Sequence, residues 1–248
     1  MNKFPRSAYV HIPFCHRRCF YCDFAVIPLG NKVETLQGYG SKTVQEYLQF
    51  LYKEILSIKH KSPLSTIYIG GGTPSILDPA QIKELIDLFK ENYGIDYGAE
   101  ITMEVDPASF TQDDLFGFIN AGINRFSLGV QSFNNQILQK SGRRHLREDA
   151  EKSCLWLKRE YDSGLIKSWS LDLIQNLPLS GFKEWQDDLD KAITFSPPHL
   201  SIYDLNIENG TVFKKLINLG KLKLPNDEEA FRNSCLLYTS DAADELCS

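Results

Sequence analysis

Short runs of apolar, largely β-branched residues recur along the chain, and each run is followed by a helical pattern of apolar and polar positions. Strands that alternate with helices in this way are typical of βα units, which form parallel sheets. The pattern therefore predicts an α/β fold. It places six strands, over residues 8–12, 66–69, 100–105, 125–130, 169–174 and 200–205.

Local signals mark the ends of two helices. Asp78 and Pro79 supply an N-cap and a first-turn proline for one helix, and Gly94 follows its end. Thr111 begins the other helix, and Gly122 stops it. Three longer amphipathic patterns predict further helices, over residues 42–59, 147–161 and 182–193.

Composition indicates a globular protein of ordinary type. The chain has 248 residues, of which 42% are hydrophobic and 24% are charged, and its formal net charge is -5. This mildly acidic balance does not indicate the basic surface that binding to duplex nucleic acid or to an anionic membrane would need. No nucleic-acid partner is therefore expected. No apolar run reaches the length of a membrane span, and residues 1–6 lack a signal-peptide segment. We therefore expect a cytoplasmic location.

The chain reads as one domain followed by a short tail. Neither a repeat of fixed period nor a low-complexity linker interrupts residues 1–232, which we assign to a single core domain. From residue 233 to residue 248 the pattern of strand and helix is lost. We interpret that stretch as a truncation or a sequence-end artefact, and we attach no function to its two cysteines.

Polar residues gather where the predicted strands end. In a parallel βα barrel the chemistry takes place at the carboxyl ends of the strands, whereas the strand middles fill the core. A cysteine trio follows the first strand and a glycine loop follows the second, while the next three strands end in Glu104, Gln131 and Asp172. We expect these groups to share one active face.

The cysteines at positions 15, 19 and 22 are the strongest single feature. Soft thiolates select zinc or iron-sulfur clusters. Structural zinc needs four ligands, usually in two pairs, and no second CxxC or HxxxH pair is present. A cubane cluster with one open iron is therefore favoured. Zinc with His11 or His16 as a fourth ligand remains an alternative, whereas the polar residues 16–18 argue against three buried structural cysteines.

Residues 9–22, YVHIPFCHRRCFYC, resemble the CxxxCxxC signature of radical S-adenosylmethionine enzymes. More narrowly, they resemble the branch that contains oxygen-independent coproporphyrinogen III oxidase and the HemW-type heme chaperones. The resemblance extends over residues 7–229. Its motifs are GGGTPS at 70–75, EVDP at 104–107, GVQSFN at 129–134, and the stretches 142–145 and 171–178.

The resemblance implies a fold and two cofactors. The fold is an incomplete (β/α)6 barrel of the TIM type with a curved parallel sheet, here without the family's C-terminal region. Cys15, Cys19 and Cys22 would hold three irons of a 4Fe-4S cluster, and the fourth iron would chelate S-adenosylmethionine. An electron from the cluster would break the ligand's carbon-sulfur bond, giving methionine and a 5'-deoxyadenosyl radical. The implied contacts of S-adenosylmethionine are Tyr9, Tyr21, Gly71, Gly72, Thr73, Glu104, Gln131, Arg143 and Asp172.

Two functions remain open within this branch. One is a heme chaperone that binds heme and passes it to an acceptor protein, and the other is oxidative decarboxylation of coproporphyrinogen III. Oxidase-like members have a further cysteine two residues after the third, whereas this chain has Phe24 there. The chaperone is therefore favoured, with His145 near the cavity rim as a candidate heme ligand. In the oxidase, Arg143 and Arg144 would grip propionates. Either function implies a reductant such as flavodoxin or ferredoxin.

Two further residues carry structural expectations. Where the family usually has an aromatic residue and a glycine before Leu-Pro, this chain has Gln175 and Asn176. Asparagine tolerates the left-handed backbone conformation that glycine would take. Cys154 falls within the apolar stripe of a predicted helix. We therefore expect it to be a small buried hydrophobic residue rather than a ligand. No catalytic residue is assigned.

Overall fold

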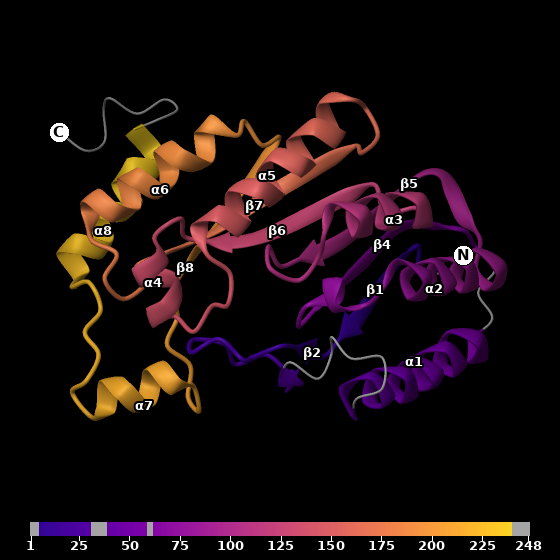
Figure 1. Ribbon diagram of the computed structural model, residues 1–248, viewed down its shortest axis with the longest axis horizontal. Helices are drawn as coiled ribbons and strands as arrows, with labels where there is room; N and C mark the ends of the chain where they lie inside the picture. Colours follow the sequence, from indigo (N-terminus) through magenta and orange to yellow (C-terminus); the bar gives the residue numbers. More distant parts are fainter. Residues whose placement is uncertain (1–4, 31–38, 59–61, 240–248) are drawn as a thin grey trace.

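A computed structural model describes residues 5–30, 39–58 and 62–239 of the chain. Its centre is a six-stranded sheet in the order β1-β4-β5-β6-β7-β8, in which every neighbouring pair is parallel (Figure 1). β1 and β8 form the two edges, so the sheet is an incomplete barrel. The strands are β1 (Ser7–Ile12), β4 (Leu64–Gly71), β5 (Ile95–Val105), β6 (Arg125–Gln131), β7 (Ser168–Gln175) and β8 (His199–Asp204).

All six predicted strands and all five predicted helices are present, and the predicted α/β fold class is confirmed. The apolar stripes of the helices and the buried positions of the strands form one continuous core. Cys154 belongs to this core and is fully buried, as expected. The five helices are α1 (Tyr39–Ser57), α2 (Pro79–Asn92), α3 (Gln112–Ala121), α5 (Arg147–Asp162) and α6 (Phe182–Thr194).

The predicted helix ends have the expected chemistry. The Asp78 carboxylate accepts from the Gln81 amide at 3.0 Å, and the Gln81 side chain accepts from the Asp78 amide in return. Thr111 forms the equivalent box with Asp114. Such boxes satisfy two backbone donors that a helix leaves without partners. Gly122 ends α3 with φ 112°, a left-handed conformation that favours glycine.

The shorter elements escaped the sequence pattern, because an apolar stripe of one or two turns shows no measurable period. They are helix α4 (Asn135–Lys140), helix α7 (Val212–Asn218), the single turn η2 (Pro74–Ile76), and the two-residue strands β2 (Phe14–Cys15) and β3 (Ile27–Pro28).

A further helix, α8 (Asp227–Thr239), runs across the proposed boundary at residue 232. Its Asn233 is fully buried, and the Trp185 indole donates to the Asn233 carbonyl at 3.0 Å. The remainder of the proposed tail, residues 240–248, lies outside the described residues. Within the described part of the chain, no helix is long and apolar enough to cross a membrane.

Asn176 takes the left-handed conformation expected of it, with φ 64°. Its side chain also joins three elements. The amide nitrogen donates to the Asp204 carboxylate at the end of β8 at 2.7 Å, and the amide oxygen accepts from Asn233 of α8 at 2.9 Å. The asparagine thus supplies a turn conformation and a buried crosslink at the same time.

Substituting Asn176 separates these two contributions. Asn176→Gly keeps the backbone freedom and removes the hydrogen bonds, whereas Asn176→Ala loses both. A left-handed residue other than glycine or asparagine costs roughly 1–2 kcal/mol, and a hydrogen bond to a charged group contributes about 1.5–3 kcal/mol. We therefore expect alanine to lower the free energy of unfolding by about 1 kcal/mol more than glycine, measured by urea denaturation. Equal losses would contradict the backbone argument.

Candidate functional site

A cavity of about 490 Å³ opens at the carboxyl ends of the strands. Eleven of the twelve site residues predicted from the sequence line it, and these residues come from the first five strands and the loops that follow them. They are Cys15, Cys19, Tyr21, Cys22, Gly71, Gly72, Thr73, Glu104, Gln131, Arg143 and Asp172.

Tyr9 is the residue that the cavity does not include. Its side chain is 61% exposed, and it borders a neighbouring recess together with His11, Phe24 and Glu104. The Tyr9 hydroxyl lies 3.0 Å from the His11 Nδ1 atom. His11 Nε2 lies 3.0 Å from the Ala25 carbonyl, which can only accept, so Nε2 donates and Nδ1 accepts from Tyr9. His11 thereby fastens the end of the cysteine loop to β1.

The loop that carries the three cysteines is closed by backbone hydrogen bonds. β2 and β3 pair in parallel, the Ile27 amide donates to the Pro13 carbonyl at 2.6 Å, and the Leu29 amide donates to the Cys15 carbonyl at 2.8 Å. Phe14 of β2 is fully buried and packs edge-on against Tyr47. The three thiols are therefore held over one end of the cavity by a loop that is anchored on both sides.

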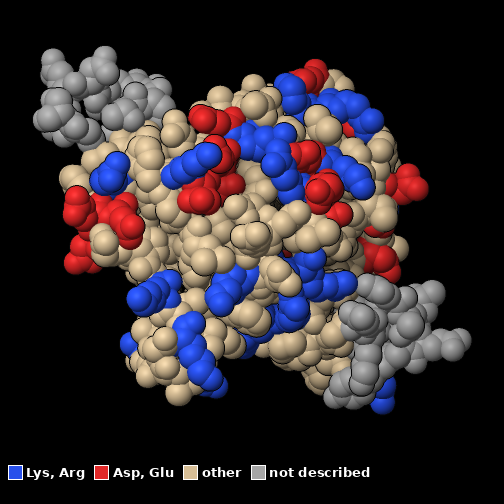
Figure 2. Space-filling view, turned by 60° about the vertical axis from the view of Figure 1, so that its left-hand side comes forward, with Lys and Arg blue, Asp and Glu red and all other residues tan. Residues whose placement is uncertain are grey.

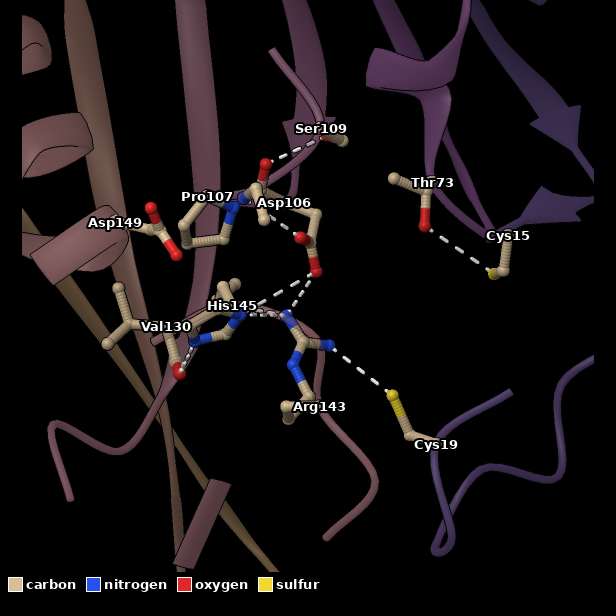
Figure 3. Close-up of polar contacts among 12 residues, drawn as sticks. Cys15, Cys19, Thr73, Asp106, Pro107, Ser109, Val130, Arg143, His145 and Asp149 are labelled. Atoms are coloured by element: carbon tan, nitrogen blue, oxygen red, sulfur yellow. Dashed lines mark hydrogen bonds and ion pairs between the residues drawn. The ribbon is translucent and has the colours of Figure 1, made fainter. Parts of the chain in front are cut away.

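Two of the thiols accept hydrogen bonds from side chains of other segments (Figure 3). Thr73 Oγ1 donates to Cys15 Sγ and Arg143 Nη1 donates to Cys19 Sγ, each at 3.5 Å. Burial raises the pKa of Cys15 to about 11, and burial also raises the pKa of Cys22. A metal must therefore displace protons from these thiols at neutral pH. In the described part of the chain, no three His, Cys, Asp or Glu side chains are grouped closely enough to hold a single metal ion.

The glycine loop after β4 is built for close approach of two backbones. A Cβ atom on Gly72 would lie 2.5 Å from the Phe14 carbonyl oxygen, and one on Gly71 would lie 2.7 Å from His11 Nδ1. Gly71 is also left-handed, with φ 115°. The Gly72 amide donates to the Ile12 carbonyl at 2.8 Å. Glycine is therefore required here by contact with the cysteine loop as well as by the turn.

Glu104 lines both the cavity and the neighbouring recess, and it is held by two hydrogen bonds. Its carboxylate accepts from the Tyr68 hydroxyl at 2.7 Å and from the Gly71 amide at 3.1 Å. Burial raises the Glu104 pKa, and these two hydrogen bonds oppose that rise because they favour the charged form. Gly70 leaves the space that the carboxylate occupies, since a Cβ atom there would lie 2.9 Å from Glu104 Oε1.

Asp172 is oriented by two serines that the sequence pattern did not single out. Ser127 donates to one carboxylate oxygen at 2.6 Å, and Ser170 donates to the other at 3.1 Å. Ser127 and Ser170 are register partners on β6 and β7, and Ser170 lies two residues before Asp172. Side chains two residues apart on a strand share a face. The spacing of Ser170 and Asp172 was therefore the sequence signal that could have identified this serine as a partner of Asp172.

Arg143 pairs with a carboxylate inside the cavity. Its Nη2 atom donates to Asp106 Oδ2 at 2.5 Å and to the Gly129 carbonyl at 2.7 Å. Burial alone would raise the pKa of Asp106, but the Arg143 guanidinium holds that pKa below its usual value. A carboxylate at the end of a strand often caps the helix that follows. Asp106 instead pairs with Arg143 and lines the cavity.

The expected position of His145 is wrong. It is 1% exposed and lies behind Arg143, not at the cavity rim. Its Nε2 atom lies 3.0 Å from the Val130 carbonyl, and its Nδ1 atom lies 3.4 Å from Arg143 Nη2 (Figure 3). Because the Val130 carbonyl can only accept, Nε2 donates, and Nδ1 of the neutral ring is left as the acceptor that faces Arg143. Both nitrogens are engaged within the protein, so neither is available as an axial ligand to heme.

Comparison with known proteins places this geometry in a family. The family model described as the radical SAM superfamily matches residues 9–170. The chain is 41% identical over 91% of its length to a heme chaperone HemW from Synechocystis, and 36% identical over 84% to one from Escherichia coli. The chain belongs to the radical SAM superfamily. Membership implies a 4Fe-4S cluster and S-adenosylmethionine as cofactors.

A solved structure supports the same conclusion. The fold matches coproporphyrinogen III oxidase (HemN) from Escherichia coli with a TM-score of 0.78 and 28% identity, over 94% of this chain and 51% of that one. The chain also spans 53% of the length of each of the two heme chaperones. It therefore corresponds to about half of each of these proteins.

The neutral His145 makes stability depend on pH. Its pKa is lowered from 6.5 to about 4, chiefly by burial and also by Arg143. Between pH 6.5 and about pH 4, His145 is therefore protonated in the unfolded chain but stays neutral in the folded chain. The free energy of unfolding consequently falls as the pH falls through this range. At pH 5 we expect a loss of about 2 kcal/mol relative to pH 7.

Urea denaturation of wild type and His145→Gln across this pH range checks the prediction. The variant is needed because burial raises the pKa of Asp188 to about 6, which gives a pH dependence of the opposite sign. The difference between the two proteins should isolate the histidine. Parallel pH profiles would show that His145 takes up its proton normally in the folded state.

Proposed function

We propose that Cys15, Cys19 and Cys22 bind a 4Fe-4S cluster and that the remaining cavity binds S-adenosylmethionine. The observation that carries this proposal is the shared cavity: three thiols line one end, and a glycine loop, two carboxylates and an arginine line the rest. Thiolates suit iron-sulfur centres. When bound, the cluster supplies the electron that cleaves the carbon-sulfur bond of S-adenosylmethionine.

The residues of this chain would bind and orient the ligand. The Gly71–Gly72 backbone lies beside Cys15 and lines the cavity, where its carbonyl groups would accept hydrogen bonds from the ligand's ammonium group. Glu104 and Asp172 are already fixed by neighbouring hydroxyl groups, so they would meet the ligand without reorganisation. Arg143 is suited to a carboxylate, but that carboxylate would have to share the guanidinium with Asp106.

The cavity mouth favours heme as cargo. Phe24 and Tyr203 line the cavity and are 61% and 56% exposed, so both rings are accessible to a ligand at the mouth. A flat macrocycle can stack on such rings. Arg18 and Arg144 also line the cavity and offer donors for propionate groups. Together with the heme chaperones among its relatives, these features support a heme chaperone that transfers heme to an acceptor protein.

The second candidate is oxygen-independent oxidation of coproporphyrinogen III. The fold similarity to the Escherichia coli oxidase favours it, and so does the set of arginines around the cavity. Against it stands position 24, where the oxidase-like pattern has a cysteine and this chain has an exposed phenylalanine. We therefore rank the chaperone first.

Cluster binding is tested by removing single thiols. After anaerobic reconstitution with iron and sulfide, wild-type protein should hold about four irons and four sulfides per chain. Cys15→Ala, Cys19→Ala and Cys22→Ala should each abolish the iron-sulfur absorbance. Cys154→Ala is the matched control and should keep it, because Cys154 is in the core. Stoichiometric zinc without iron-sulfur absorbance would overturn the cluster.

The chaperone is tested on the full-length protein. Heme titration followed by absorbance should show binding at roughly micromolar concentration, and reconstituted protein should show no conversion of coproporphyrinogen III. Phe24→Ala should weaken heme binding about tenfold through loss of one stacking partner, whereas Phe50→Ala, a control on α1 that is 70% exposed, should not. Robust oxidation to protoporphyrinogen without heme binding would restore the oxidase.

A further inference from the structure

The acidic net charge of the chain conceals a strongly uneven distribution. Three segments, residues 13–22, 132–147 and 209–226, contain no Asp or Glu at all. All three are nonetheless rich in basic residues, in a protein in which acidic residues outnumber basic ones, 32 to 27. Their basic residues are Arg17, Arg18, Lys140, Arg143, Arg144, Arg147, Lys214, Lys215, Lys221 and Lys223.

The fold brings these three segments together around the cysteine loop. The Phe20 amide donates to the Ser141 carbonyl at the end of α4, and the Phe213 amide at the start of α7 donates to the Phe20 carbonyl, both at 2.9 Å. The Phe213 ring packs against Phe20 and Tyr21, and with Ile137 of α4 it forms a small core separate from the main one. The chain between Cys19 and Cys22 is thus clamped between α4 and α7.

The outer side of this clamp forms the α4–α7 surface, which we define as Lys140, Lys214, Lys215, Lys221 and Lys223 with the apolar Val212 and Leu219. In the space-filling view the lower left region, where α7 lies, shows basic side chains and no acidic ones (Figure 2). Within the described part of the chain, none of these lysines is within ion-pair distance of a carboxylate. Leu219 is 66% exposed among them.

We propose that this α4–α7 surface docks an acidic one-electron carrier protein of the flavodoxin type, which reduces the cluster. The inference rests on the proposed cluster and adds the site of its reductant. The carrier would lose one electron and the cluster would gain it, with no bond made or broken. The surface belongs to the two helices whose ends hydrogen-bond Phe20, between Cys19 and Cys22, so a carrier seated there would approach the cluster from outside the cavity.

The composition of the surface fits such a partner better than a permanent one. Electron-transfer encounters use small interfaces with charged groups that steer the approach, and complementary charge raises the association rate more than the affinity. Lysines without ion-pair partners around a little exposed apolar area meet that description. The five lysines lie outside the cavity lining, so substrate and cofactor binding do not explain them.

The test reverses the charge of three exposed lysines in the full-length protein, Lys140→Glu, Lys215→Glu and Lys221→Glu. The matched control reverses three exposed lysines elsewhere, Lys53→Glu on α1, Lys90→Glu on α2 and Lys152→Glu on α5, so that the net charge changes equally. The probe is reduced flavodoxin, and the measured quantity is the second-order rate constant of cluster reduction by stopped flow. Binding of oxidised flavodoxin to the protein is measured by calorimetry as a readout that needs no cluster.

We expect the surface triple to slow reduction about tenfold at low salt and to weaken flavodoxin binding, with the difference lost at high salt. The control triple should leave both unchanged. The iron content and the heme affinity of the triple variant of the surface should equal those of wild type. If no protein, including wild type, bound iron, the result would contradict the proposed cluster and not the docking surface.

Equal effects of the two triples, or none from the surface triple, would overturn the proposal. Phosphatidylglycerol vesicles supply the remaining comparison. If the surface triple abolished binding to these vesicles while flavodoxin binding and reduction stayed unchanged, the surface would be assigned to an anionic membrane and the carrier would be excluded.

Discussion

The close approach of two backbones, the end of β4 and the cysteine loop, is the constraint on which the site depends. The Gly72 amide bonds to Ile12, the Thr73 amide bonds to Phe14, and there is no space for a side chain at either Gly71 or Gly72. This contact fixes where Cys15 stands relative to the sheet. It also brings Thr73 to the Cys15 sulfur and the Gly71 amide to Glu104. One packed junction therefore sets the positions of a thiol, a hydroxyl and a carboxylate together.

Elsewhere in the cavity, three charged side chains are each held in place by a hydrogen bond to a neighbouring side chain. Asp172 rests on Ser127 and Ser170, Glu104 rests on Tyr68, and Arg143 rests on Asp106. Buried polar groups are costly when they lack hydrogen bonds, so each of these pairs stabilises the fold and also orients a group for binding. His145 belongs to this supporting set. Its burial behind Arg143 moves it from the class of heme ligands to the class of residues that position a cavity side chain.

The segment from Gly142 to His145 holds the cysteine loop in place. Its carbonyl groups receive the Arg17 side chain, which donates to Gly142 at 3.0 Å and to Arg143 at 2.7 Å. Phe20 covers Gly142 so closely that a Cβ atom there would lie 2.7 Å from the ring. The motif therefore docks the cysteine loop from the side opposite to β4, and the two contacts together hold the loop over the cavity.

The sequence by itself determined the α/β class, the six strands, the capped helices and eleven of the residues that line the cavity. It did so because hydrophobic periodicity and capping are local, and because parallel topology brings all strand ends to one edge. Tertiary structure alone decided which groups are partners and which are exposed. The pairing of Arg143 with Asp106, the burial of His145, the exposure of Tyr9 and the basic surface of α4 and α7 arise from contacts between segments far apart in the chain, and no local pattern encodes those contacts.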